Sequence, residues 1–362
     1  MTANELRAVF DATEPLTVGL EEEVMLLDPE TLDLADVASQ VLRPGGRVKL
    51  ELPAAQLEVV TQPAARMGDA IAELAAGRRE LAEMAGTAAR PAAAGVHPFA
   101  APIGALNAGE RYDAILEAYG DVARSQQVCA LQVHVALGSS DATLAVYNAL
   151  RGHLPELAAL AANAPFHAGR DTGLASVRPL IGGLLPRQGV PPAIPSWEAF
   201  AEMLSWLEDP RQWWWELRPH PTFGTLELRV CDAQTTVAEA EAVASFAHAL
   251  ITWLAERYAA GEELGVPDTW RIAENRWAAC RSGLEGEFRD LATGERRPVR
   301  DVLRERMEQI GCDVSPLLER NGAIRQREVG LQGVTAWLAD RFLSSDPLAE
   351  PAGSLSADRT GA

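Results

Sequence analysis

Basic side chains are in the minority in this chain. It has 32 Lys and Arg residues against 51 Asp and Glu residues, which gives a formal net charge of −19. A nucleic-acid surface, or a face for anionic membranes, requires a clustered excess of positive charge. We therefore expect no nucleic-acid partner and no membrane partner. A phosphate-bearing ligand stays compatible with this charge if metal ions and a few placed arginines offset it.

Cysteine is also scarce, with four residues spread widely along the chain. No two of them form a C-x-x-C pair, so a zinc site of the usual spacing is disfavoured, and there is no disulfide framework. No segment approaches the roughly 20 apolar residues that a membrane helix needs. Met1 to Phe10 lacks a basic stretch followed by an apolar run, so we expect no signal peptide and a soluble, cytoplasmic protein.

What the chain does contain is a normal supply of core residues. Its 362 residues are 48% hydrophobic and 23% charged, which is typical of a globular protein. This length allows one large domain or two ordinary ones. Because we find no internal repeat and no clear linker, the sequence predicts a single domain over residues 1–343. The segment 344–362, rich in Ser, Pro, Gly and Ala, is predicted to be a flexible tail.

Secondary structure follows from periodicity and from capping signals. Alternation of apolar and polar residues predicts strands, and Ala- and Leu-rich segments with Glu and Arg predict helices. Thr236 and Glu239 form a capping box, and Pro155 is expected to kink or divide a helix. The Pro- and Gly-rich stretch 163–197 is typical of a long functional loop. The predicted strands are 17–27, 56–60, 128–137, 213–219 and 224–231; the predicted helices are 67–89, 141–162 (capped by Ser140 or Asp141), 237–260, and one each after Pro298 and Ser315.

Four of these strands have a group of polar side chains on one face. Side chains alternate between the two faces of a strand, so each strand here has one strongly apolar face for a core. The opposite face carries carboxylates, amides, a histidine or an arginine. If the strands belong to one sheet, these polar groups converge. The residues that share this face are Glu21 and Glu23; Gln56 and Glu58; Gln132 and His134; and Thr225, Glu227 and Arg229.

Converging carboxylates need compensation, because like charges raise one another's pKa. Oxygen ligands with one imidazole suit Mg²⁺ or Mn²⁺. Several such ions, with an arginine nearby, fit phosphoryl transfer. A single Glu-x-Glu is also typical of an ordinary solvated sheet face. Repetition of the pattern on four strands favours a shared site over four separate surfaces.

The same residues lie in stretches that resemble the type 2 glutamate–cysteine ligases, bacterial carboxylate–amine ligases related to glutamine synthetase. The stretches run in order from about residue 17 to about residue 310, and together they are very specific. They are Gly19-Leu20-Glu21-Glu22-Glu23, Gln56-Leu57-Glu58-Val59-Val60-Thr61, Gly95-Val96-His97-Pro98-Phe99, Gly169-Arg170-Asp171-Thr172-Gly173, the run from Arg218 to Asp232, and Glu274-Asn275-Arg276-Trp277.

The resemblance implies an α+β fold with a glutamine-synthetase-like catalytic core, a curved, mainly antiparallel sheet with helices packed on one face. It implies that ATP phosphorylates the side-chain carboxylate of glutamate and that an amine such as that of cysteine then attacks the acyl phosphate. It also implies that Arg229 faces the transferred phosphoryl group and that Arg229 and Glu58 act in catalysis. The metal ligands implied by position, for Mg²⁺ or Mn²⁺, are Glu21, Glu23, Glu51, Glu58 and Glu227.

Further candidates for substrate or nucleotide binding are Gln132 and His134 of the strand 128–137, together with several arginines and an asparagine. Arg178, Arg218 and Arg170 offer guanidinium groups for a carboxylate or phosphate, although surface loop arginines have the same pattern. Asn275 and Arg276 are candidates for the nucleotide site, and a plain helix cap is the alternative for them. A homodimer is compatible with the sequence.

The chain departs from the family pattern at one position. Relatives usually have His-Val-His where this chain has Gln132-Val133-His134. An amide oxygen is a weaker metal ligand than imidazole, and His134 lies about 6.6 Å farther along the same face. Three readings follow: a glutamate–cysteine ligase, a ligase of the same fold for another amine or carboxylate, or a catalytically impaired nucleotide-binding relative.

Overall fold

The structure of the chain, a computed structural model, describes residues 1–207 and 212–346. Its centre is a seven-stranded sheet in the order β2-β3-β1-β5-β9-β8, with β4 also paired to β1. Every pairing within this sheet is antiparallel. The strands are β1 (Val18–Leu27), β2 (Val48–Leu50), β3 (Gln56–Val60), β4 (Arg90–Ala92), β5 (Ala130–Ala136), β8 (Leu217–His220) and β9 (Thr225–Asp232).

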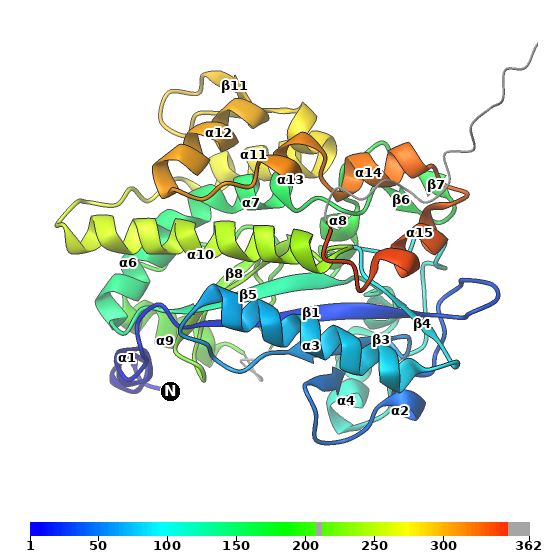
Figure 1. The fold of residues 1–362 in the computed structure, drawn as a ribbon. Coiled ribbons are helices and arrows are strands. Elements are labelled where there is room, and N and C mark those ends of the chain that lie inside the picture. The colour runs from blue at the N-terminus through cyan, green and yellow to red at the C-terminus, as the bar shows by residue number, and fades with distance from the viewer. Residues whose placement is uncertain (208–211, 347–362) are drawn as a thin grey trace, which may run out of the picture.

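Two long helices, α3 (Met67–Ala85) and α10 (Val237–Ala259), lie across one face of this sheet (Figure 1). The apolar sides of the strands face them, and Leu20, Leu57 and Val133 are at most 1% exposed. Contact between layers is close at Gly77 of α3, where a Cβ would lie 2.2 Å from Val59 of β3. The predicted α+β class, with a mainly antiparallel sheet and helices packed on one face, is confirmed.

The remaining elements surround this two-layer centre. Helix α11 packs against α7, and the hairpin of β10 and β11 packs against α11 and α12 above the sheet (Figure 1). The other elements are α1 (Ala3–Asp11), α2 (Ala38–Val41), α4 (Glu110–Tyr119), α5 (Asp121–Arg124), α6 (Ser140–Leu150), α7 (Leu154–Leu160), β6 (Phe166–His167), β7 (Arg170–Asp171), α8 (Arg178–Gly182), α9 (Trp197–Ser205), α11 (Thr269–Ser282), β10 (Glu287–Arg289), β11 (Arg296–Pro298), α12 (Val299–Ile310), α13 (Ser315–Glu319), α14 (Gly322–Val329) and α15 (Val334–Arg341).

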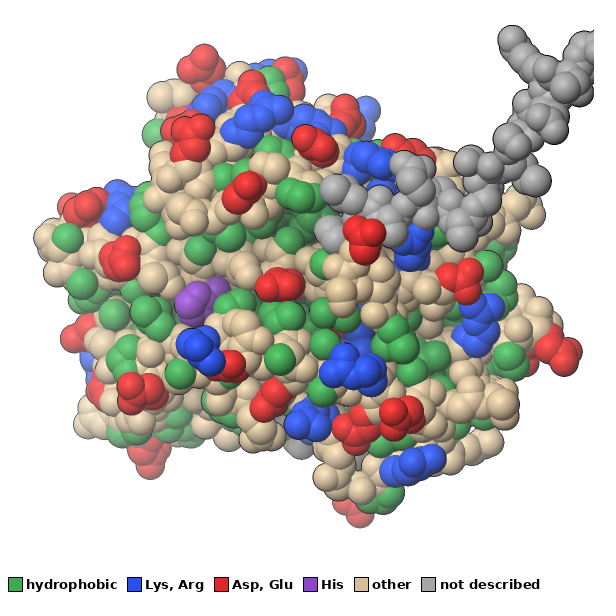
Figure 2. All heavy atoms as spheres, in the orientation of Figure 1, with side chains coloured by type: hydrophobic (Ala, Val, Ile, Leu, Met, Phe, Trp, Pro, Cys, Tyr) green, Lys and Arg blue, Asp and Glu red, His purple; other side chains and the backbone are tan. Residues whose placement is uncertain are grey.

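On the face that α3 and α10 cover, the described acidic and basic side chains are interspersed, without a large patch of either sign (Figure 2). Among the described residues, no helix has the length and apolar character needed to cross a membrane. The predicted tail lies outside the described residues from position 347 onward.

Several predicted boundaries need correction. The helix predicted over 67–89 ends at Ala85, because Gly86 takes a positive φ of 53° and residues 90–92 join the sheet. The predicted helix is divided near Pro155, as one of the two predicted outcomes, and Pro155 lies in the first turn of α7. The cap of the preceding helix is Ser139, whose side chain accepts from the Ala142 N–H. The capping box of α10 is confirmed.

The loop predicted over 163–197 is wrong in part, because it contains the β6–β7 hairpin and helix α8. The strand predicted over 213–219 starts only at Leu217. Before that point the backbone turns to other partners: the Glu216 N–H donates to the Gly189 carbonyl, and the Trp213 carbonyl accepts from the Arg218 side chain.

Candidate active site

The polar sides of the strands do meet on one face of the sheet, opposite α3 and α10. In an antiparallel sheet, residues directly opposite each other point to the same face. The register therefore brings the predicted carboxylates, amide, histidine and arginines together, and the convergence predicted from four separate strands is confirmed. The opposed pairs are Glu23–Glu58, Glu21–Gln132, His134–Glu227 and Arg218–Glu227.

Three carboxylates cluster at one end of this face. Oxygens of Glu23, Glu51 and Glu58 all lie within 4.8 Å of one another. Burial, together with the charge of Glu51, raises the pKa of Glu23 to about 7. Burial and the neighbouring glutamates raise the pKa of Glu58 well above its ordinary value. Three hard oxygen ligands that repel one another in this way fit a divalent cation such as Mg²⁺.

Glu227 has a different environment from these three. It is 1% exposed, and its carboxylate accepts from both Arg218 and Arg229, the latter at 2.5 Å. Burial alone would raise the pKa of Glu227, but the two arginines outweigh burial and hold it well below its ordinary value. Glu227 therefore keeps its charge and fixes both guanidinium groups on the sheet face.

Gln132 joins the two halves of the site. Its Nε2 donates to Glu23 at 3.2 Å, and its Oε1 accepts from Arg229 at 2.5 Å. The contact is made across an irregularity in the β5–β9 register between Leu131 and Val133. The oxygen expected to be a weak metal ligand is thus occupied by an arginine. Gln132 therefore orients Arg229 relative to the carboxylates, which is a different role from that of the metal-binding histidine expected at this position.

His134 and Glu21 lie beside this bridge. The Nε2 atom of His134 is 3.7 Å from a Glu21 oxygen, and its Nδ1 is 3.0 Å from the Thr225 hydroxyl. Gly19 is the residue paired with His134, and a Cβ at Gly19 would be 3.8 Å from the imidazole Cβ. Glu21, His134 and Glu227 form the middle of the polar face, between the carboxylate cluster and the turn of β8 and β9.

Glu22 points to the opposite face, as strand alternation predicts. It is fully buried and forms two hydrogen bonds with Arg78 of α3, at 2.7 and 2.6 Å. This partner lies 56 residues away, beyond any local sequence pattern. The middle glutamate of the Glu21-Glu22-Glu23 run therefore joins the sheet to the helices behind it, while its two neighbours belong to the site.

Arg178 and Arg276, expected to bind substrate or nucleotide, are engaged within the protein. Arg178 pairs with Asp232 at 2.8 Å and donates to three carbonyl groups near the end of β9. Arg276 forms a buried ion pair with Glu216 at 2.7 Å. Both therefore fix the backbone around β8 and β9, which carries the site.

Asn275 and Arg170 lie away from the polar sheet face. The side chain of Asn275 accepts from the N–H of Arg289 and donates to its carbonyl, which fixes α11 to β10. This contact is not a helix cap. Arg170 lies on the exposed β6–β7 hairpin, where it pairs with His167 in the two-stranded register.

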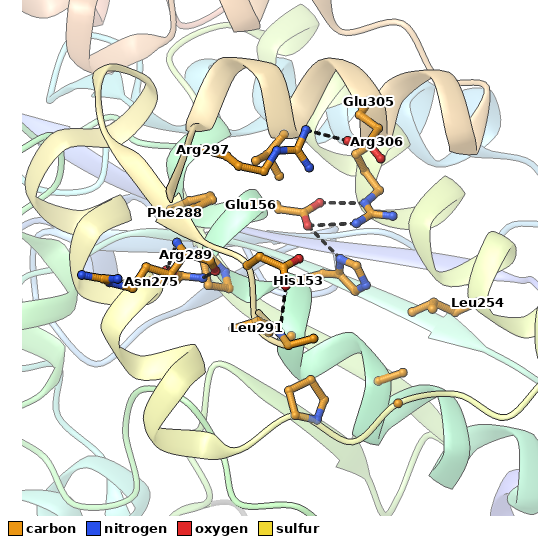
Figure 3. Close-up of a pocket in the computed structure, with 18 of the residues that line it drawn as sticks. His153, Glu156, Leu254, Asn275, Phe288, Arg289, Leu291, Arg297, Glu305 and Arg306 are labelled. Atoms are coloured by element: carbon orange, nitrogen blue, oxygen red, sulfur yellow. Dashed lines mark hydrogen bonds and ion pairs between the residues drawn. The ribbon is translucent and has the colours of Figure 1, made fainter. Parts of the chain in front are cut away.

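A separate hollow of about 370 Å³ lies among α7, α11, α12 and the β10–β11 hairpin. Figure 3 shows His153 and Arg306 both directed at Glu156 in its wall. Burial would raise the pKa of Glu156, but contacts with His153 and Arg306 lower it to about 2. Glu156 is thus bound by two side chains of the same wall. The carboxylates of the sheet face are not among its lining residues.

Comparison with known proteins decides what this arrangement is related to. The model of glutamate–cysteine ligase family 2 matches residues 17–322. The chain belongs to this family. Membership places it among enzymes of the carboxylate–amine ligase type, and the match spans the carboxylates, Gln132 and the arginines of the sheet face.

Individual relatives agree with this assignment. The chain is 36% identical over 365 residues to a protein of Rubrobacter xylanophilus provisionally named glutamate–cysteine ligase 2-3, covering 91% of this chain and 98% of the relative. It is 33% identical over 336 residues to a protein of Frankia alni provisionally named glutamate–cysteine ligase 2-1, covering 88% and 86%.

Solved structures share the fold at low sequence identity. One is a glutamate–cysteine ligase from Francisella tularensis in complex with AMP, with a TM-score of 0.67, 12% identity and coverage of 94% of this chain and 91% of that chain. Another is a bifunctional glutathione synthetase from Pasteurella multocida, with a TM-score of 0.56, 16% identity and coverage of 94% and 50%. These likenesses support the architecture of the sheet and its helical layer.

Proposed function

We propose that this family member is an ATP-dependent ligase that joins the side-chain carboxylate of glutamate to the amine of cysteine. The main observation behind the proposal is that Glu23, Glu51 and Glu58 lie on the same sheet face as Glu227, whose carboxylate is bound by arginine. The family supports the ligase class, and the AMP complex of the Francisella protein is consistent with use of a nucleotide.

A divalent cation is part of this proposal. Glu23, Glu51 and Glu58 have the ligand chemistry to hold Mg²⁺ or Mn²⁺, because their oxygens lie close together and the carboxylates repel one another. When bound, such an ion offsets the negative charge of phosphate oxygens. We propose that Glu21 and Glu227 lie beside the phosphate groups of ATP in the same site.

The first chemical step is phosphoryl transfer. An oxygen of the glutamate side-chain carboxylate forms a bond to the γ-phosphorus of ATP, and the bond to the ADP oxygen breaks. In this proposal, Arg229 stabilises the charge on the moving group. Although burial lowers the pKa of Arg229, the charge of Glu227 raises it above its ordinary value, so the guanidinium stays protonated.

The second step forms the amide. The amine nitrogen bonds to the acyl carbon, the bond from that carbon to the phosphate oxygen breaks, and the nitrogen loses a proton. The products are γ-glutamylcysteine, ADP and phosphate. The chain contributes position and fixed charge: Arg218 and Arg229 are both held by Glu227, and Gln132 fixes the direction of Arg229.

Two measurements test the function and its alternatives. The first is glutamate-dependent release of ADP with Mg²⁺ or Mn²⁺ present. Tight ATP binding without turnover would support the impaired relative instead. The second is product analysis with a panel of amines. Turnover with other amines and none with cysteine would keep the ligase class and remove cysteine as the acceptor.

A further inference from the structure

An aromatic cluster lies on the same face as the proposed ligase site, at the turn between β8 and β9. The rings of His220 and Phe223 stack with their centroids 4.2 Å apart and an interplanar angle of 8°. His134, in the middle of the polar face, meets each ring edge-on at 5.8 Å. One side of Phe223 is thus covered, yet the residue is 54% exposed.

The turn that carries this cluster is held in place. The Nδ1 atom of His220 accepts from the backbone N–H groups of Thr222 and Phe223. Gly224 has a φ of +67°, and a Cβ there would lie 2.6 Å from the Val9 carbonyl of α1, so the turn is seated directly on that helix. Burial lowers the pKa of His220 to about 4, and the ring is therefore neutral at pH 7.

The register fixes how far this cluster lies from the reacting end of the site. Arg229 lies opposite Gln132, the next row holds His134 and Glu227, and the row after that pairs Thr225 with His220. Each row is two residues farther along the strands, so His220 is about 13 Å beyond Arg229. Arg218 and Arg229 lie between the carboxylate cluster and the aromatic rings.

We propose that Phe223 is the platform on which the purine base of ATP stacks. The inference rests on the proposed function and adds the place of the base. With its terminal phosphate near Arg229, a nucleotide extending toward the β8–β9 turn places its phosphates past Arg218 and its base at Phe223. Glutamate and cysteine have no flat ring for such a surface, whereas every base has a face that stacks on an aromatic ring.

The test is calorimetric titration of the magnesium complex of a non-hydrolysable ATP analogue into four proteins. These are the wild type, Phe223→Ala, Phe223→Tyr and the control Trp270→Ala, which removes a ring that is 65% exposed on α11. Loss of base stacking in Phe223→Ala is expected to weaken binding about tenfold. Phe223→Tyr and Trp270→Ala are expected to bind like the wild type.

Inorganic tripolyphosphate with magnesium separates base recognition from phosphate recognition. Its affinity is expected to be the same in the wild type and in Phe223→Ala. Equal binding of the ATP analogue by these two proteins would overturn the inference and leave the ligase function standing. Equal loss of tripolyphosphate would also overturn it, because the ring would then only support the turn. A wild type that binds no nucleotide would overturn the proposed function as well.

Discussion

Substitution of adjacent glutamates in the run Glu21-Glu22-Glu23 should have different effects. Glu22→Gln should lower the stability of the fold, whereas Glu23→Gln should abolish turnover. Arg78, its partner, is fully buried. Besides its two bonds to Glu22, Arg78 donates to the carbonyl groups of Gln234 at 2.6 Å and Phe342 at 2.6 Å. One guanidinium thus joins α3, β1, the segment before α10 and the end of α15.

Loss of the carboxylate leaves that guanidinium as an unpaired buried charge. Breaking a buried ion pair from one side costs about 3–5 kcal/mol. A glutamine can still accept one hydrogen bond, so we expect a loss of about 3 kcal/mol in the free energy of unfolding. This is a large part of the roughly 5–15 kcal/mol that stabilises a typical domain.

Glu23→Gln is the matched control, one residue away on the same strand. The raised pKa of Glu23 shows that its charge is unfavourable without a cation, so the neutral side chain is expected to stabilise the protein in chelator, by up to about 3 kcal/mol at pH 8. The same variant is expected to abolish turnover. Urea denaturation of both variants with chelator present, followed by ADP release assays, gives the comparison. A loss below about 1 kcal/mol for Glu22→Gln, or equal losses for both, would refute the reasoning.

Three further predictions concern the carboxylate cluster and two contacts that hold the site. In chelator, Glu23 of the folded protein has a pKa of about 7, against 4.5 ordinarily, so it holds a proton more tightly than in the unfolded chain. The free energy of unfolding should therefore fall by up to about 3 kcal/mol between pH 4.5 and pH 8. Denaturation at several pH values checks this, and Glu23→Gln should flatten the dependence of stability on pH. Arg276→Ala leaves Glu216 buried without its partner and should cost about 3–5 kcal/mol, seen as a clear drop in Tm; an unchanged Tm would count against a structural ion pair. Gln132→Ala removes the acceptor that orients Arg229 and should lower kcat by about 10- to 100-fold at little cost in Tm; an unchanged kcat would rule out the bridge.

Strand alternation accounts for most of what the sequence predicts correctly. It separates Glu22 from Glu21 and Glu23, and it places Glu58 and Glu227 on polar faces before any pairing is known. Alternation carries this information because a strand has only two sides. It carries no information on which strands are neighbours or in which register, and these decide that Glu23 meets Glu58.

The residues that the sequence assigns less well are arginines and amides. Arg178 and Arg276 have the side chains of ligand-binding residues, yet Asp232 and Glu216 engage them within the protein. Their partners lie 54 and 60 residues away, beyond any local pattern. Gln132 likewise appears as a missing histidine in the sequence, and only the irregular β5–β9 register shows its bond to Arg229.

The central claim is that glutamate is activated as an acyl phosphate, and oxygen tracing tests it most directly. The enzyme would be supplied with ATP, Mg²⁺, cysteine and glutamate carrying ¹⁸O in its side-chain carboxylate. Attack of that carboxylate on the γ-phosphorus, followed by amide formation, predicts that each phosphate released carries one ¹⁸O atom from glutamate. Unlabelled phosphate, or release of AMP and pyrophosphate in place of ADP, would contradict the account.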